Sequence, residues 1–124
     1  MTRKMLIVDD EESILKLLVT IFGPTNDYTI FCARDGETAL KAARADNPDI
    51  MLLDNRLPGI SGLEVCGKVK SDPTMSLIKV LILSCQGQNF DWQKAREMGA
   101  DSYITKPFNS SLLVEKVAEL LGNN

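Results

Sequence analysis

Carboxylate, hydroxyl and ammonium side chains stand at the ends of short apolar runs in this sequence, and together they could accept a phosphoryl group. The five side chains are Asp9, Asp10, Asp54, Ser84 and Lys106. A carboxylate that attacks phosphorus forms an acyl phosphate, and the reaction otherwise needs groups that position the phosphoryl oxygens and offset their charge. We therefore predict that Asp54 is the nucleophile, that Lys106 pairs with one phosphoryl oxygen, and that the Ser84 hydroxyl donates a hydrogen bond to another.

The three carboxylates, Asp9, Asp10 and Asp54, would repel one another if they lie together. Two like charges about 4 Å apart repel by roughly 4 kcal/mol at an effective dielectric constant near 20. A hard divalent cation relieves this repulsion, because Mg²⁺ favours carboxylate and carbonyl oxygens and commonly bridges to phosphate. We therefore predict a weak, exposed site for Mg²⁺ or Mn²⁺.

Histidine is absent from the sequence, which excludes several kinds of site. A Ser-His-Asp triad, a Cys-His pair and an imidazole metal ligand cannot be built. The three cysteines, Cys32, Cys66 and Cys85, are widely spaced and form no C-x-x-C pair, which argues against a disulfide framework and a thiolate zinc site. The chemistry must rest on carboxylates, hydroxyls and lysine.

The elements that position these groups alternate in type along the chain. Short runs rich in aliphatic and β-branched residues predict strands at 4–9, 28–33, 49–54, 77–84 and 101–105. Segments with helical spacing of apolar residues predict helices at 14–21, 35–45, 61–72, 90–98 and 109–121. Gly87 is expected to end the fourth strand.

Capping residues set the expected helix ends. Asp35 and Asn109 can cap the second and the last helix, and Ser61 has capping-box spacing to Glu64. Gly99 can close the fourth helix at its C-terminus. Boundaries of these four helices are therefore predicted from chemistry as well as from periodicity.

This alternation predicts a doubly wound α/β fold, in which an open parallel sheet of five strands carries helices on both faces. In such a sheet the carboxyl ends of all strands meet at one rim, and ligands bind there where the strand order reverses. The polar groups named above end four different strands. We therefore expect them to converge at that rim.

Length and composition bound the kind of protein. A chain of 124 residues with 44% hydrophobic and 25% charged residues is typical of one globular domain, which we place at residues 1–124. Its longest apolar stretches fall well short of the roughly 20 residues of a membrane span, and its first residues lack a secretory pattern, so we expect a cytoplasmic protein without membrane association. A net charge of -3 without a dense basic stripe argues against direct nucleic-acid binding.

The sequence around the strand ends resembles the receiver domains of two-component response regulators, the CheY-like superfamily. The matching segments are Leu-Ile-Val-Asp-Asp-Glu at 6–11, Leu-Leu-Asp at 52–54 followed by Leu-Pro-Gly at 57–59, Ser84, and Gly-Ala-Asp-Ser-Tyr-Ile-Thr-Lys-Pro-Phe at 99–108. The similarity runs over essentially the whole chain. It implies a flavodoxin-like sheet with strand order 2-1-3-4-5.

The resemblance also assigns roles to individual residues. It implies that Asp54 is the phosphoacceptor, that Asp10 and Asp54 ligate the metal directly, that Asp9 acts largely through water, and that the main-chain carbonyl of Arg56 completes the protein ligands. Ser84 and Tyr103 would form a switch pair, in which Ser84 moves toward the phosphoryl group and Tyr103 turns inward. Lys106 and Pro107 would be joined by a cis peptide bond.

Partners follow from the same resemblance. The phosphoryl donor would be a phosphohistidine on a sensor histidine kinase or a histidine phosphotransfer protein. The face made by the fourth helix, fifth strand and fifth helix would change shape to control a downstream protein or an output domain. Such a switch catalyses only its own phosphotransfer and autodephosphorylation, so it is not an enzyme in the usual sense. Both a stand-alone regulator and a part of a larger one remain open.

Several positions depart from the commonest pattern of the family. Arg56 puts a long cation beside the site, and we expect it to alter the lifetime of the phosphoryl group. Cys85 stands where a smaller residue is usual and would narrow access, while Ser102 replaces a second acidic residue on the dimerisation face. Phe90 and Trp92 either form a partner-binding patch on that face or pack into the core.

Three alternatives to a working receiver remain open. A flavin- or nucleotide-binding protein can share the fold, but it would carry a Gly-rich phosphate loop where this sequence has acidic residues after the first strand. A phosphatase of the haloacid-dehalogenase type would carry a second carboxylate two positions after the nucleophile, where Arg56 stands. A pseudo-receiver that works without phosphorylation would lack part of the rim set, which is complete here.

Overall fold

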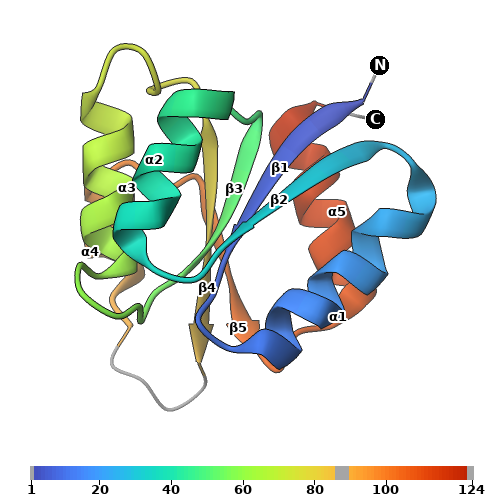
Figure 1. Ribbon diagram of the computed structural model, residues 1–124. Helices are drawn as coiled ribbons and strands as arrows, with labels where there is room; N and C mark the ends of the chain where they lie inside the picture. Colours follow the sequence, from blue (N-terminus) through green and yellow to red (C-terminus); the bar gives the residue numbers. More distant parts are fainter. Residues whose placement is uncertain (1, 86–89, 123–124) are drawn as a thin grey trace.

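Strands and helices alternate along the part of the chain that the computed structural model describes, residues 2–85 and 90–122 (Figure 1). In chain order the elements are β1 (Arg3–Val8), α1 (Glu12–Phe22), the short 3-10 helix η1 (Gly23–Thr25), β2 (Tyr28–Ala33), α2 (Gly36–Asp46), β3 (Ile50–Asp54), α3 (Gly62–Ser71), β4 (Lys79–Cys85), α4 (Trp92–Glu97), β5 (Ser102–Lys106) and α5 (Ser110–Leu121). The predicted order of elements is therefore confirmed.

The five strands form one parallel sheet in the order β2-β1-β3-β4-β5. Helices α1 and α5 cover one face, and α2, α3 and α4 cover the other (Figure 1). This is the doubly wound, flavodoxin-like α/β fold that was predicted. The strand order reverses at β1 and β3, since the chain moves from β1 outward to β2 and then returns to the far side of β1.

The core lies in two layers, one on each side of the sheet, because successive side chains of a strand point to opposite faces. In β3, Met51 and Leu53 pack beneath α2, α3 and α4, whereas Ile50 and Leu52 pack against α1 and α5. All five residues of β3 are buried. The central strands are thus held from both sides, which fixes the position of the groups at their ends.

Side-chain caps begin three of the helices as predicted. Asp35 accepts a hydrogen bond from the backbone N–H of Thr38, and Ser61 accepts one from Glu64. The Asn109 side chain caps α5 in the same way. Gly99 follows α4 with a φ of +102°, a conformation that glycine adopts without steric cost.

Three predicted element starts are wrong by two residues. The first helix begins at Glu12 and not at 14, because the apolar spacing starts at Ile14 while the first turn of the helix is polar. The fourth strand begins at Lys79 and not at 77, since the backbone of Ile78 still donates to Met75 in the preceding turn and Leu77 is 91% exposed. The fourth helix spans Trp92–Glu97 and not 90–98, because Asp91 caps it by accepting from the N–H of Lys94. The predicted end of the fourth strand at Gly87 lies outside the described residues.

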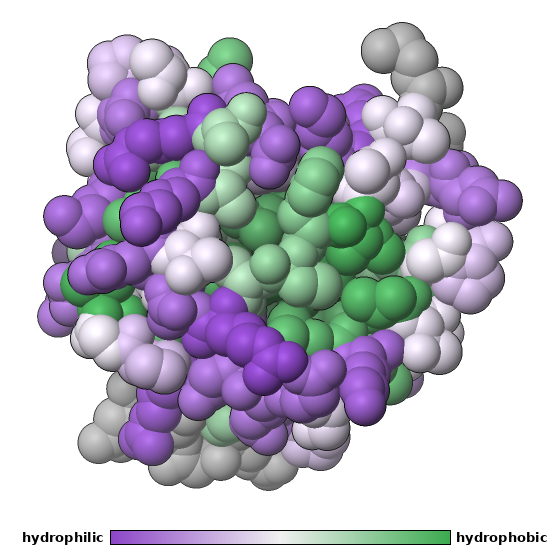
Figure 2. Space-filling view, in the orientation of Figure 1, coloured by the Kyte–Doolittle hydropathy of each residue, from purple (hydrophilic) through white to green (hydrophobic). Residues whose placement is uncertain are grey.

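The face seen in Figure 2 is largely hydrophilic at its rim and carries an apolar patch on the side where β2 forms the edge of the sheet. A shallow hollow of about 480 Å³ lies there between α1 and β2. It is lined by Glu12, Leu15, Lys16, Val19, Thr20, Cys32 and Arg34. Among the described residues, none of the helices is both long and apolar enough to cross a membrane.

Candidate functional site

The acidic residues predicted to converge do meet at the carboxyl ends of the central strands. Asp9 and Asp10 follow β1, and Asp54 is the last residue of β3, which is the neighbour of β1 in the sheet. One carboxylate oxygen from each of the three residues lies within 4.8 Å of the others. The cluster lies where the strand order reverses, which is the position expected for a ligand site in this kind of sheet.

A buried lysine lies against this cluster. The Nζ atom of Lys106, at the end of β5, is 2.7 Å from Oδ2 of Asp9 and 3.6 Å from Oδ1 of Asp54. Asp9 is fully buried, and its other oxygen accepts a hydrogen bond of 3.0 Å from the backbone N–H of Glu11. Lys106 therefore neutralises one carboxylate of the cluster and leaves the remaining negative charge uncompensated.

The position of Asp54 is fixed by a close approach of two backbones. Gly62, the first residue of α3, lies so near the end of β3 that a Cβ atom on it would come 2.1 Å from the main-chain oxygen of Asp54. The N–H of Gly62 donates to the main-chain oxygen of Asn55 over 3.1 Å. The loop between β3 and α3 is thereby closed directly behind the carboxylate.

Burial and charge make Asp54 hard to ionise. Removal from water is the main cause, and the negative charge of Asp9 adds to it, so the pKa of Asp54 rises to about 6. The charge of Lys106 and a hydrogen bond from the N–H of Arg56 act in the opposite direction but do not cancel the increase. A buried carboxylate with a raised pKa at the strand ends is a candidate functional group.

The pKa of Lys106 also reflects the cluster. Burial alone would lower the pKa of this lysine, but the hydrogen bond to Asp9 and the negative charges of Asp54 and Asp9 outweigh burial and raise it. Lys106 is therefore a firmly protonated ammonium group facing the carboxylates. Such a group can bind an anion only if the anion competes with Asp9 for it.

The remaining predicted residues surround this centre. Ser84 is buried near the end of β4, and its hydroxyl donates to the main-chain oxygen of Ile104 over 3.5 Å. The side chain of Arg56 is exposed, while its N–H donates to Asp54. The peptide bond between Lys106 and Pro107 is cis, as the resemblance implied.

Tyr103 lies further out on β5 and is 36% exposed. Its ring packs at a tilt against two other aromatic rings, with centroid distances of 4.9 Å to Trp92 and 5.3 Å to Phe90. Phe90 and Trp92 are half-buried and also pack against the core layer under α2, α3 and α4. Core packing, one of the two arrangements predicted for Phe90 and Trp92, is therefore present. Their contact with Tyr103 was not predicted from the sequence.

The donor set at the rim fits a hard divalent cation. Asp9, Asp10 and Asp54 supply carboxylate oxygens close enough together to share one ion, and Asp10 is open to solvent. The excess negative charge and the raised pKa of Asp54 are both features that a bound cation would relieve. The residues present therefore fit a magnesium or manganese ion.

Glu11 is a fourth acidic residue that the sequence reasoning did not single out. Its Oε1 lies 3.9 Å from Nζ of Lys106, and its side chain is half-exposed. The only signal in the sequence is its place directly after Asp9 and Asp10. Glu11 increases the negative charge that faces Lys106.

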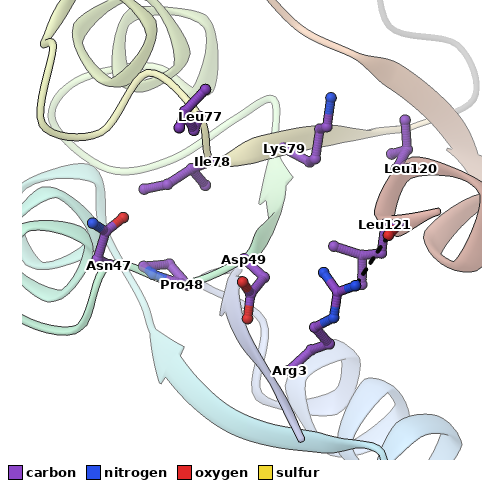
Figure 3. A pocket seen from close by; sticks show the side chains of 9 residues that line it. All are labelled: Arg3, Asn47, Pro48, Asp49, Leu77, Ile78, Lys79, Leu120 and Leu121. Atoms are coloured by element: carbon purple, nitrogen blue, oxygen red, sulfur yellow. Dashed lines mark hydrogen bonds between the residues drawn. The ribbon is translucent and has the colours of Figure 1, made fainter. Parts of the chain in front are cut away.

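A different hollow, of about 330 Å³, lies at the opposite end of the sheet, where the strands begin (Figure 3). It is lined by Arg3, Asn47, Pro48, Asp49, Leu77, Ile78, Lys79, Leu120 and Leu121. The side chain of Arg3 donates to the main-chain oxygen of Leu121 there. The residues predicted to carry chemistry lie at the other end.

The fold and the acidic rim define a class of protein, the doubly wound α/β domains with a carboxylate cluster at the strand ends. The sequence profile of the response regulator receiver domain matches residues 5–118. The chain belongs to the family of response regulator receiver domains. This membership decides against a flavin protein and against a dehalogenase-type phosphatase.

Individual relatives agree with the family. The chain is 39% identical over 121 residues to the alkaline phosphatase synthesis transcriptional regulatory protein PhoP of Bacillus subtilis (strain 168), covering 98% of this chain and 49% of PhoP. The chain thus spans about half the length of that relative. A proposed response regulator from Chloroflexus aurantiacus J-10-fl has a similar structure, with a TM-score of 0.92, 31% identity and coverage of 98% of this chain and 99% of that one.

A second similar structure contains a metal. The receiver domain of sensor histidine kinase PA1611 from Pseudomonas aeruginosa PAO1 has a TM-score of 0.88, 20% identity, and coverage of 98% of this chain and 99% of its own. At that identity the likeness concerns the fold alone. Its structure has a magnesium ion coordinated in the active-site cleft.

Receiver domains act as phosphorylation switches in two-component signalling and have no separate catalytic activity beyond autodephosphorylation. Response regulators interact with histidine kinases and with output domains.

Proposed function

We propose that this chain accepts a phosphoryl group on Asp54 from a phosphohistidine of a sensor histidine kinase or a histidine phosphotransfer protein. The observation that carries the proposal is the position of Asp54, which is buried at the strand-reversal rim, faces a protonated lysine at 3.6 Å and belongs to a cluster of three carboxylates. A nucleophile and a charge-offsetting cation are the parts that phosphoryl transfer requires.

In the proposed reaction a carboxylate oxygen of Asp54 bonds to phosphorus as the bond from phosphorus to the imidazole nitrogen of the donor breaks. The electron pair of that bond stays with the imidazole, which takes up a proton from solvent. Lys106 pairs with one phosphoryl oxygen, and the Ser84 hydroxyl leaves the Ile104 carbonyl to donate to another. Lys106 already lies near Asp54, so a small shift away from Asp9 suffices.

Asp10 and Asp54 would hold the divalent cation directly, Asp9 would act largely through water, and the main-chain carbonyl of Arg56 would complete the protein ligands. A bound Mg²⁺ supplies positive charge that offsets the carboxylates and the phosphoryl oxygens. The support for this assignment is the spacing of the carboxylate oxygens and the raised pKa of Asp54. Asp10, which is exposed, is the member of the set most open to exchange of the ion.

Ser84 and Tyr103 form the proposed switch pair. When Ser84 moves toward the phosphoryl group, Tyr103 turns inward and alters the face made by α4, β5 and α5. That face then controls a downstream protein or an output domain. The switch needs a difference in stability between the two arrangements, which phosphorylation supplies through contacts that form in only one of them.

We further propose that residues 1–124 act as one receiver domain in the cytoplasm, without direct contact with nucleic acid or membrane. PhoP, which is about twice as long, is named as a transcriptional regulator. A role in transcription for this chain would therefore depend on a segment or partner other than the receiver domain, since the chain carries a net charge of -3.

Intact mass spectrometry after treatment with acetyl phosphate and Mg²⁺ tests the proposal. The parent should gain the mass of one phosphoryl group, and Asp54→Asn should gain none. Equal labelling of both proteins would place the acceptor elsewhere, and no labelling of the parent would contradict the proposed function. Repeated turnover of a phosphomonoester by the parent would instead favour a phosphatase.

A further inference from the structure

Three aromatic side chains, Phe90, Trp92 and Tyr103, form a cluster between α4 and β5. The Tyr103 ring is tilted by 39° to the Trp92 ring and by 47° to the Phe90 ring, at centroid distances of 4.9 and 5.3 Å. Both distances lie within the range in which aromatic rings attract each other. We name these three residues the aromatic cluster.

The position of Tyr103 on its strand explains why this contact forms. Ile104, the next residue on β5, points to the core layer of α1 and α5. Alternation along the strand therefore directs Tyr103 to the side of α4. Trp92 is the first residue of α4, directly after the capping residue Asp91, so its ring meets Tyr103 at the start of that helix.

We propose that Trp92 and Phe90 are positioning residues that hold Tyr103 in its outward orientation in the unphosphorylated protein. The inference rests on the proposed switch role of Tyr103 and adds to it the groups that set its resting equilibrium. In this proposal the inward turn of Tyr103 breaks the two observed ring contacts, so these contacts favour the outward arrangement alone. Only contacts that differ between two arrangements shift the balance between them.

The expected bias is large enough to measure. One favourable aromatic pair changes an equilibrium by about two- to twelvefold. When the acceptor-competent arrangement is rarely populated, the apparent rate of phosphorylation falls with its population. Loss of the Trp92 ring should therefore speed phosphorylation by about two- to tenfold.

Trp92 also supplies a direct readout, because it is the only tryptophan of the chain. Its fluorescence emission reports on the ring that lies against it. Replacing Tyr103 with Ala should change the emission of the unphosphorylated protein, whereas Tyr103→Phe keeps a ring and should leave the emission close to that of the parent. Phosphorylation of the parent should change the emission as well.

The test compares phosphorylation by acetyl phosphate with Mg²⁺, followed by intact mass, in the parent, Trp92→Ala, Trp92→Phe and Leu77→Ala. Leu77 is a matched control, since it is a large apolar residue that is 91% exposed and belongs to the opposite end of the sheet. Trp92→Ala should be labelled about two- to tenfold faster than the parent. Trp92→Phe should restore most of the parent rate, and Leu77→Ala should match the parent.

The possible failures are distinguishable. If the parent is labelled at Asp54 but Trp92→Ala is labelled at the same rate, the positioning role is wrong and the proposed function stands. An equal acceleration in Leu77→Ala would also overturn the positioning role, because it would indicate a general loosening. If the parent takes no phosphoryl group, the proposed function fails and the positioning role fails with it.

Discussion

Charged side chains at the two ends of the β-sheet differ in the partners that offset their charge. At the end where the strands begin, Asp49 accepts a hydrogen bond of 2.7 Å from the backbone N–H of Lys4, and Arg3 donates to the backbone at Leu121. At the end where they finish, Asp9 and Asp54 are buried side by side, with one lysine between them. Each charge in the first group is paired with a main-chain atom of another element. In the second group two buried carboxylates repel each other, although both accept main-chain hydrogen bonds and share one lysine.

The size of a hollow therefore does not identify the functional end of the sheet. The hollow in Figure 3 is well formed, yet polar groups of the main chain already satisfy its charged residues in part. The acidic rim has an excess of like charge that the protein alone does not offset. An excess of this kind indicates where a charged ligand binds.

Removing one lysine from each end should give the largest contrast. Lys106→Met should lower the free energy of unfolding by about 3 kcal/mol without divalent cations, because it leaves buried carboxylates without their counter-charge. Lys79→Met, at the other end, should stay within about 0.5 kcal/mol of the parent. Urea denaturation in a chelating buffer measures both, and equal losses at the two positions would contradict the contrast.

Neutralising Asp54 should stabilise the metal-free protein. Its pKa is raised from 3.8 to about 6 in the folded state, so the folded state binds this proton more tightly than the unfolded state does. Stability is therefore lost as the pH rises from about 4 to 6, and two pKa units correspond to about 2 to 3 kcal/mol. Asp54→Asn should exceed the parent by that amount at pH 7.5.

The advantage of Asp54→Asn should almost vanish at pH 3, where the parent is protonated at this position in the folded state and largely so in the unfolded state. Thermal denaturation at the two pH values in chelator checks the change. An advantage that does not depend on pH would mean that packing, and not ionisation, is responsible.

Magnesium should have a smaller effect on stability, and only through the acidic rim. At a concentration about ten times its dissociation constant, Mg²⁺ should stabilise the parent by about 1.4 kcal/mol. Asp10→Asn should reduce this response, while Asp49→Asn at the opposite end should retain it. Melting temperatures with and without Mg²⁺ provide the measurement, and a response that survives in Asp10→Asn would argue against the proposed ligand set.

Arg56 should have the smallest effect, on the lifetime of the phosphoryl group. Its exposed side chain stands two residues after Asp54 and can limit the approach of water. Arg56→Ala should lose the label about two- to fivefold faster. Arg44→Ala, which removes an arginine from the last turn of α2, should decay like the parent. Identical decay in all three proteins would end this role for Arg56.

The sequence was sufficient for most of the fold because its signals there are local. Asp35, Ser61 and Asn109 begin their helices as predicted, since a cap needs only a side chain and a backbone N–H three residues away. The boundary at Leu77 was wrong because hydrophobicity alone cannot tell a strand residue from an exposed one in a turn. The predicted start of α4 at Phe90 was wrong because Asp91 caps the helix, which places Phe90 before its first turn.

For the site, the sequence could predict which residues meet at the strand ends, but not how their side chains are buried and paired. Parallel strands bring their carboxyl ends together, so the meeting of Asp9, Asp10 and Asp54 followed from the order of elements. The depth of burial of Asp9 and its pairing with Lys106 depend on how side chains pack between distant strands. The aromatic cluster depends in the same way on the distance between α4 and β5, which no local pattern contains.

Gly62 carries no charge, yet its position next to the backbone of Asp54 restricts substitution there as strongly as chemistry restricts the acidic residues. Any side chain there would collide with the backbone that carries Asp54, and the nearest obstacles are main-chain atoms, which cannot swing aside. In a mutational library scored for signalling, position 62 should therefore be as intolerant as the acidic rim itself. A map of intolerant positions would thus include a position constrained by the main-chain carbonyl of Asp54, in addition to the charged positions of the site.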